Sequence, residues 1–232
     1  MLLRTILVAA ALTALSAAPA LAQDPPFLDS IKPCYVVANE AQREPVAVSG
    51  HNFTPFALVD IYVDDIVQPV TGNQPQVDLN GLLAGSVFAP YIDEGQRAFT
   101  LRVAERGPNP KSAIAPATKV TRLSVEQQPA AAATSDRVKF RGRGFTDLTK
   151  NIYMHYVFAG KSKRTVDLGL PTGDCGLFSV RRKQFPFKKS PQVGVWTLQF
   201  DQEAKYNPKA SPRVPLTIKV RRKIKPTLAQ AR

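Results

Sequence analysis

The sequence predicts an all-β protein with two tandem antiparallel β-sandwich domains after a signal peptide. Three observations predict this fold class. One strand-like phrase occurs twice, and apolar residues gather in short runs rich in valine, phenylalanine and tyrosine. Beyond the first 22 residues, we find no convincing amphipathic-helix window with apolar residues at i, i+3, i+4 and i+7. The 20 prolines also disfavour long helices.

Residues 1–22 have the pattern of a secretory signal peptide. Arg4 precedes an apolar run that ends in Ala20-Leu21-Ala22, a small-residue cleavage site. A membrane-spanning anchor is the alternative, but the run is interrupted by Pro19 and is short for a span of about 20 residues. We therefore expect a secreted, extracellular protein. The remaining length suits two domains of about 100 residues each.

The repeated phrase divides this remaining chain into two similar halves. VAVSGHNFTPF at 46–56 returns as VKFRGRGFTDL at 138–148, with Val, Gly, Phe and Thr in register. Further segments return in the same order: DIYVDD at 60–65 as NIYMHY at 151–156, NGLLAGSVFAP at 80–90 as CGLFSVRRKQFP at 175–186, and FTLRV at 99–103 as WTLQF at 196–200. Apolar residues alternate with polar ones in the opening phrase, which predicts a strand with one buried face.

The repeat and the composition together predict the domain boundaries. QQPAAAATSD is small, polar and free of apolar periodicity, which is typical of a linker. We expect a first sandwich at 23–126, a linker at 127–136, a second sandwich at 137–225 and a frayed tail at 226–232.

The first half resembles a known family. PPFLDSIKPCYVV at 25–37 and REPVAVSGHNFTPFALVDIYVDD at 43–65 are similar to the opening of a bacterial immunoglobulin-like domain of the TIG kind. The shared features are an extended first strand, a strand closing on Gly-x-x-Phe and a third strand ending in acidic turn residues. The resemblance extends to both repeats and implies spacers or binding modules without built-in chemistry. The whole arrangement also resembles uncharacterised exported proteins of high-GC actinobacteria.

Two cysteines remain for the mature chain, Cys34 in the first half and Cys175 in the second. In an oxidising compartment they can form one disulfide. The alternative is a pair of buried free thiols that act as small apolar residues. The sequence leaves both interpretations open.

Residues able to carry catalysis or bind a metal are sparse. His51 and His155 occupy non-equivalent positions, so they could share a zinc ion only across domains. We expect His51 in a turn and His155, on a strand with Tyr153, on an exposed aromatic face. Asp60, Asp64 and Asp65 could bind calcium but fit a solvated acidic turn better. The sequence therefore predicts a non-enzymatic protein with no cofactor, catalytic or metal site.

Charge distinguishes the two halves. Residues 23–125 hold 8 Lys and Arg against 11 Asp and Glu, whereas residues 126–232 hold 22 against 7. The candidate anion-binding residues are Lys139, Arg141, Arg143, Arg181, Arg182, Lys183, Lys219 and Arg221. The strands that carry the 139–143 and 219–221 stripes belong to different sheets of a TIG-like sandwich, so the stripes are expected on opposite sides. Charge that serves only solubility is the alternative.

These observations predict an exported binding or envelope-associated module whose second domain attracts an anionic polymer or a membrane surface. The alternative is a structural spacer or scaffold whose partner is another exported protein. A hydrolase with an unrecognised site is a third, weaker hypothesis. Nucleic acid is disfavoured as a partner, because an exported protein seldom meets it.

Overall fold

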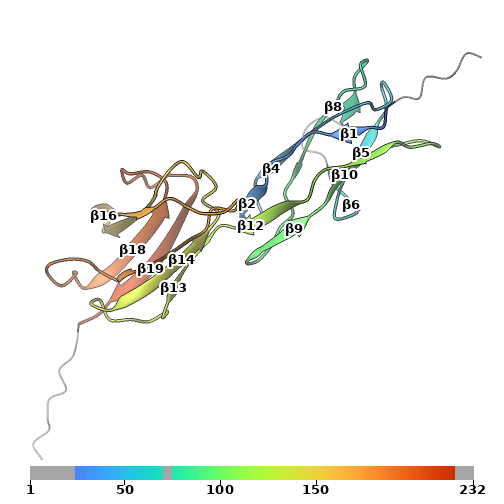
Figure 1. Ribbon diagram of the computed structural model, residues 1–232. Helices are drawn as coiled ribbons and strands as arrows, with labels where there is room; N and C mark the ends of the chain where they lie inside the picture. The colour runs from blue at the N-terminus through green and yellow to red at the C-terminus, as the bar shows by residue number, and fades with distance from the viewer. Residues whose placement is uncertain (1–23, 70–74, 223–232) are drawn as a thin grey trace, which may run out of the picture.

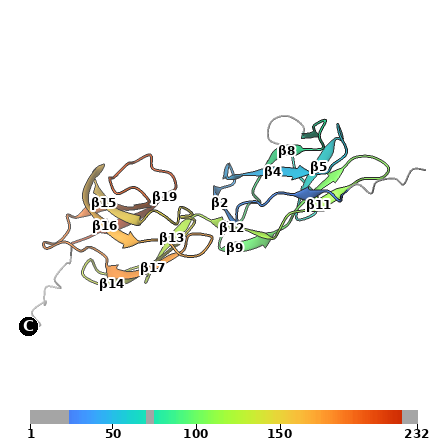
Figure 2. The ribbon, with the colours of Figure 1, turned by 45° about the horizontal axis from the view of Figure 1, so that its top comes forward.

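The computed structural model describes residues 24–69 and 75–222, which form 19 strands and no helix. Accordingly, none of the described residues belongs to a helix that could cross a membrane. The strands build two lobes that lie end to end (Figures 1 and 2). The expected signal peptide and tail lie outside the described residues.

The first lobe packs two principal sheets against each other. One has the order β1-β4-β8-β7 and contains β1 (Phe27–Leu28), β4 (Pro45–His51), β8 (Leu83–Phe88) and β7 (Gln76–Val77). The other has the order β11-β10-β5-β6 and contains β11 (Ser112–Ile114), β10 (Leu101–Glu105), β5 (Val59–Val63) and β6 (Ile66–Val67).

A further sheet of the first lobe extends toward the second lobe. Its order is β3-β2-β12-β9, with β3 (Gln42–Arg43), β2 (Cys34–Asn39), β12 (Thr118–Arg122) and β9 (Gln96–Phe99). β2 and β12 run parallel, whereas β12 and β9 are antiparallel. Since β9 and β12 lie just before β10 and just after β11 in the chain, this sheet continues the β11-β10-β5-β6 layer.

The second lobe repeats the arrangement with fewer strands. Its smaller sheet has the order β13-β14-β17, with β13 (Ser124–Gln128), β14 (Arg137–Arg143) and β17 (Phe178–Lys183). Its larger sheet has the order β16-β15-β18-β19, with β16 (Lys161–Gly169), β15 (Ile152–Phe158), β18 (Gly194–Asp201) and β19 (Arg213–Val220). In the second lobe, β13, β14 and β17 form one sheet and β15, β18 and β19 belong to the other. Their equivalents in the first lobe are divided in the same way, with β1, β4 and β8 in one sheet and β5, β10 and β11 in the other. That is the strand order of an immunoglobulin-like sandwich. The predicted fold class is confirmed.

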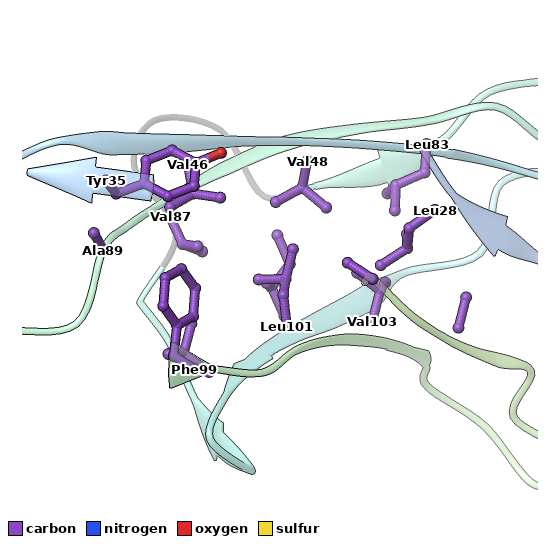
Figure 3. Close-up of a cluster of buried hydrophobic side chains, with 14 of the residues drawn as sticks. Leu28, Tyr35, Val46, Val48, Leu83, Val87, Ala89, Phe99, Leu101 and Val103 are labelled. Atoms are coloured by element: carbon purple, nitrogen blue, oxygen red, sulfur yellow. The ribbon is translucent and has the colours of Figure 1, made fainter. Parts of the chain in front are cut away.

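The two lobes bury equivalent residues. Val46 and Val48 of β4 are buried, as are Val138 and Phe140 of β14. Figure 3 shows Val46 and Val48 pointing across the first core toward Leu101 and Phe99 of the facing sheet. In the second lobe, Trp196 is buried at the position that corresponds to Phe99. The repeated phrase therefore encodes one strand and its core face twice.

The Phe of the repeated phrase closes the core in both lobes. Phe53 and Phe145 are buried, and each donates its backbone N–H to a glycine carbonyl, Gly81 or Gly176, at 3.2 and 3.3 Å. Both glycines have positive φ, 76° and 58°. A Cβ there would lie 2.7 Å from the Phe53 oxygen or 2.0 Å from the Phe145 oxygen. Glycine is required at both positions because the phenylalanine backbone passes so close.

The first glycine of the phrase is required for space and not for its backbone conformation. Gly50 and Gly142 lie within their strands, and neither has positive φ. A Cβ on Gly142 would lie 2.2 Å from the Phe178 ring, and one on Gly50 would lie 2.6 Å from the Phe27 oxygen. These glycines make room for neighbours. They do not supply backbone freedom.

Replacing Gly176 with alanine is expected to destabilise the second domain by more than about 2 kcal/mol, because strain at positive φ adds to a backbone clash. Gly160→Ala is the matched control. Its φ is 74°, but nothing lies within 4 Å of the added Cβ, so only about 1 kcal/mol is expected. Urea unfolding of both variants measures the difference. Equal losses would show that the close approach to Phe145 is unimportant.

The boundary between the domains differs from the predicted one. The first domain ends with β12, Leu123 donates its N–H to Val37, and β13 already pairs with β14 of the second domain. The predicted linker at 127–136 therefore does not join the domains. Its residues complete β13 and form a loop inside the second domain, fixed by Phe185 N–H to Thr134 O at 3.1 Å. Low apolar content there reflects an exposed loop.

Candidate functional site

The outer side of the β13-β14-β17 sheet carries a dense set of cations. Alternate residues of β14 point outward, and β17 pairs with it in antiparallel register. Lys139 lies opposite Arg181, and Arg137 lies opposite Lys183. We call the set the basic face; its residues are Arg137, Lys139, Arg141, Arg143, Arg181 and Lys183.

The like charges that lie opposite each other on β14 and β17 lower the stability of the fold. Directly opposed residues on one side of a sheet have Cβ atoms about 4.5–5.5 Å apart, and like charges there are destabilising. Glu126 is the one acidic residue among the described residues that face outward from this sheet. Its carboxylate lies 3.6 Å from the Arg143 guanidinium. The other outward residues of β13 and β17 are Ser124, Gln128 and Ser179. The face is therefore strongly positive and free of exposed apolar side chains.

The first domain shows that the fold does not require these cations. β4 pairs with β8 in the same register as β14 with β17. The equivalents of the six cations are Pro45, Ala47, Ser49, His51, Ser86 and Phe88. Five of these are uncharged types, and His51 is held by Asp29 at 3.2 Å. The same sandwich thus folds with or without the charge.

Three of the eight residues predicted as an anion-binding surface lie elsewhere. Arg182 points away from the outer side and donates to the Asp167 carbonyl at 2.9 Å. Lys219 lies on β19 in the opposite sheet, and Arg221 follows the end of that strand. The expectation that the two basic stripes face opposite sides agrees with this placement. Sequence reasoning missed Arg137, although it continues the two-residue spacing of Lys139, Arg141 and Arg143.

His155 is not on an exposed aromatic face, contrary to the sequence interpretation. Its side chain is buried, with Nε2 3.2 Å from Asp201 Oδ1 and 3.0 Å from the Glu203 carbonyl. Because both of these partners accept, Nε2 carries the proton, and Nδ1 lies 2.9 Å from the Thr165 hydroxyl. The ring of Tyr206 packs against the imidazole, with ring centroids 5.7 Å apart. This network fastens the segment between β18 and β19 over the outside of its sheet.

The remaining ionisable candidates form local contacts. His51 ends β4 and stacks on Phe27 with ring centroids 4.9 Å apart. The three aspartates of the predicted acidic turn bind arginines: Asp60 with Arg106 and Asp64 with Arg97 at 2.6 Å, and Asp65 with Arg102 at 3.3 Å. Within residues 24–69 and 75–222, no three His, Cys, Asp or Glu side chains gather as a metal site would require.

Tyr156 is an ionisable group whose surroundings are almost entirely apolar. Its hydroxyl is buried between the sheets and has no hydrogen-bond partner within the described part of the chain. Burial raises the pKa of this phenol far above its usual value, although Arg164 and Arg182 act in the opposite direction. The phenol therefore stays neutral at physiological pH.

The junction of the two domains is crosslinked. Cys34 at the start of β2 and Cys175 in the loop before β17 form a disulfide, with Cα atoms 5.3 Å apart. Next to it, Lys119 of β12 contacts Asp174 at 3.4 Å. A cleft of about 810 Å³ lies between the domains, and its charged lining residues are Arg43, Glu44, Lys209 and Arg213. Three of these residues are cations, and the carboxylate of Glu44 is ion-paired with Lys32 at 2.6 Å.

No protein-family model matches the chain, and no curated protein matches it. Among solved structures it is similar to a fragment of the ICAM-5 ectodomain, with 12% identity and a TM-score of 0.32 over 87% of this chain and 48% of that one. The titin Ig tandem domains show 12% identity and a TM-score of 0.26, covering 84% of this chain and 94% of theirs. Murine CEACAM1b shows 15% identity and a TM-score of 0.23, covering 84% and 98%. The chain thus spans about half of the ICAM-5 fragment. The immunoglobulin-like assignment rests on the strand order, and function has to be inferred from the surface.

Proposed function

We propose that the protein is an exported, non-enzymatic binding module whose basic face holds an anionic polymer of the cell envelope, with the first domain as a TIG-like spacer. The observation that carries the proposal is the pairing of like charges on β14 and β17. Repulsion lowers the stability of the free protein where Lys139 lies opposite Arg181 and Arg137 lies opposite Lys183. An anion bound between the members of a pair removes this repulsion.

The geometry of the face suits an extended polyanion. Alternate residues of a strand are about 6.6–6.8 Å apart, so the four cations of β14 form a row about 20 Å long. Arg181 and Lys183 form a second row on the neighbouring strand, about 4.8 Å away. A linear chain of phosphate, sulfate or carboxylate groups can lie along these rows and contact several cations at once.

The face favours a soluble polymer over a bilayer. Binding at a membrane interface combines cations with apolar side chains that enter the acyl boundary. The outward residues between the cations are serine, glutamine and glutamate, and none is apolar. Export and the TIG-like character of the first domain support a polymer of the envelope as the natural ligand, since such domains act as spacers or binding modules.

Neutralising part of the basic face is expected to reduce polymer binding and its salt dependence together. In the variant Lys139→Ala, Arg141→Ser, Arg143→Ser, three of six cations are lost, and the first two replacements are the residues at the equivalent positions of the first domain, Ala47 and Ser49. Each neutralised charge on a flexible polyanion contributes about 0.7 to the slope of log affinity against log salt. We expect the slope to fall from about −4 to about −2. Titration with teichoic acid and heparin between about 0.05 and 0.2 M salt measures it.

A control of equal charge separates a localised site from general attraction. Arg213→Ser, Lys219→Ser, Arg221→Ser removes three cations from and beyond β19, on the opposite sheet. This variant is expected to keep nearly the parental affinity. If both variants lose the same affinity, the charge acts diffusely. If the parent does not bind at low salt, or binds without salt dependence, the charge serves solubility and the chain is a spacer or a scaffold for a protein partner.

A further inference from the structure

A depression whose lining differs from the basic face lies at the end of the second domain that is remote from Cys175. It has a volume of about 360 Å³ and lies between the β15–β16 turn and the segment that leads from β17 to β18. Its lining combines three lysines with two aromatic rings: Lys163, Lys188, Lys189, Phe187 and Trp196. None of these residues belongs to the basic face.

The floor of the depression is fixed by packing. The ring centroids of Phe187 and Trp196 lie 5.5 Å apart, with an angle of 43° between the ring planes. The rings of Phe158 and Phe185 also pack against Trp196, with centroid distances of 4.9 and 5.3 Å. The indole N–H of Trp196 donates to the Gln192 carbonyl at 2.8 Å, which ties the rim to the floor. The apolar surface is therefore formed before any ligand arrives.

A β-bulge brings the first lysine to the rim. Across β15 and β16, Tyr156 pairs with Arg164 but Val157 pairs with Ser162, so Lys163 is the extra residue. Bulges redirect side chains and occur often beside functional sites. Lys188 and Lys189 follow Phe187 directly in the chain and also line the depression, and all three lysines are exposed.

Few carboxylates are available to neutralise these lysines. Asp136 lies at the same end of the domain, and its carboxylate accepts the Ala133 N–H at 2.7 Å. Within the described chain no ion pair joins a carboxylate to any of the three lysines. Most other carboxylates of the second domain lie toward the first domain: Asp147, Asp167, Asp174, Asp201 and Glu203.

We propose that this depression binds a saccharide unit that bears a phosphate or sulfate group. The three ammonium groups supply donors and positive charge for a tetrahedral oxyanion. The face of Phe187, half-buried on Trp196, offers an apolar platform for the sugar ring. A preformed apolar floor with a few convergent polar groups is the usual composition of small-ligand sites, and about 360 Å³ is near the lower end of their size range.

The site carries its own reporter, because Trp196 is the sole tryptophan of the sequence. We expect glucose 6-phosphate and glucose 6-sulfate to cause a saturable change in tryptophan fluorescence. Glucose should cause none, and inorganic phosphate should bind at least tenfold more weakly than glucose 6-phosphate. Phosphate that binds as tightly as glucose 6-phosphate would overturn the saccharide assignment. A parent protein with no saturable response to either sugar ester would overturn the site.

Two variants separate this site from the basic face. Lys188→Ser, Lys189→Ser should weaken glucose 6-phosphate at least tenfold while leaving the slope for heparin unchanged. The variant Lys139→Ala, Arg141→Ser, Arg143→Ser should reduce the slope for heparin and leave the affinity for glucose 6-phosphate unchanged. Since both lysines are exposed, the fold is expected to survive, and an unchanged urea midpoint checks this. If both variants lose glucose 6-phosphate binding to the same extent, a discrete site is refuted. If the parent protein binds glucose 6-phosphate but not heparin, the proposed function fails while this site stands.

Discussion

Replacing Trp196 with alanine is expected to lower the free energy of unfolding of the second domain by about 3–5 kcal/mol. The indole is only 3% exposed and packs against the rings of Phe158, Phe185 and Phe187. Truncation removes these contacts and leaves a cavity that the rigid strands on either side cannot close. Urea unfolding followed by far-UV circular dichroism measures the loss.

Val195→Ala is the control for this experiment. Val195 is the neighbour of Trp196 on β18, but it points outward and is 56% exposed. Its truncation should change stability by no more than about 0.5 kcal/mol. A loss below about 1 kcal/mol for Trp196→Ala would show that the aromatic cluster contributes little. It would also weaken the equivalence of Trp196 with Phe99 that the repeat implies.

The repeat predicted the strands because a sandwich depends on period-two burial and on a few positions where only one residue fits. Val46 with Val138 and Phe53 with Phe145 are buried in pairs. These are local signals that a sequence states directly. The choice of sandwich followed from the same signals, since short alternating strands can bury one side only against a second sheet.

The domain boundary could not be predicted, because the signal used for it was misleading. Small polar residues at 127–136 suggested a linker, but they complete β13 and form a loop within the second domain that is tied to Phe185. Along the chain, the two domains are joined by the single residue Leu123, whose side chain packs against the core of the second domain. An apolar residue in a continuous strand-like run gives no sign that the chain changes from one sandwich to the next.

The partners of His155 were equally hidden. Asp201 is 46 residues away in sequence, and the pairing depends on β15 and β18 being neighbours. The alternation of β15 placed His155 on the outer side, which was correct. The burial comes from the segment after β18, which folds back over that side and brings Tyr206 onto the imidazole. A pattern of alternating residues describes a strand but not what later covers it.

The basic face was predicted in part. The stripe on β14 was visible as alternating cations, but its union with Arg181 and Lys183 depends on the β14–β17 register. Arg182 interrupts the second stripe in sequence, so RRK gave no indication of which side each cation takes. The lysines of the second depression were less visible still. Lys163 reaches the rim through a bulge, and it lies about 25 residues from Lys188 and Lys189 in the sequence.

Removing the disulfide is expected to lower the free energy of unfolding by up to about 5 kcal/mol. The bridge spans 141 residues, and a loop of that length gives this value in the chain-entropy model. Each domain has its own core, so the variant Cys34→Ala, Cys175→Ala should still fold. We expect it to unfold in two separate steps, because the domains are then joined only at Leu123 and by weak contacts such as Lys119 with Asp174.

Urea unfolding without reductant, followed by Trp196 fluorescence for the second domain and circular dichroism for both, measures this effect. The matched control is reduction by dithiothreitol, which should shift the parent toward the variant and leave the variant unchanged. Thiol titration of the denatured, unreduced parent should find no free thiol, and two per chain would reject the bridge. Identical unfolding curves for parent and variant would instead mean that the domain contacts suffice without it. In that case the crosslink would fix the direction of the basic face relative to the first domain without stabilising either core.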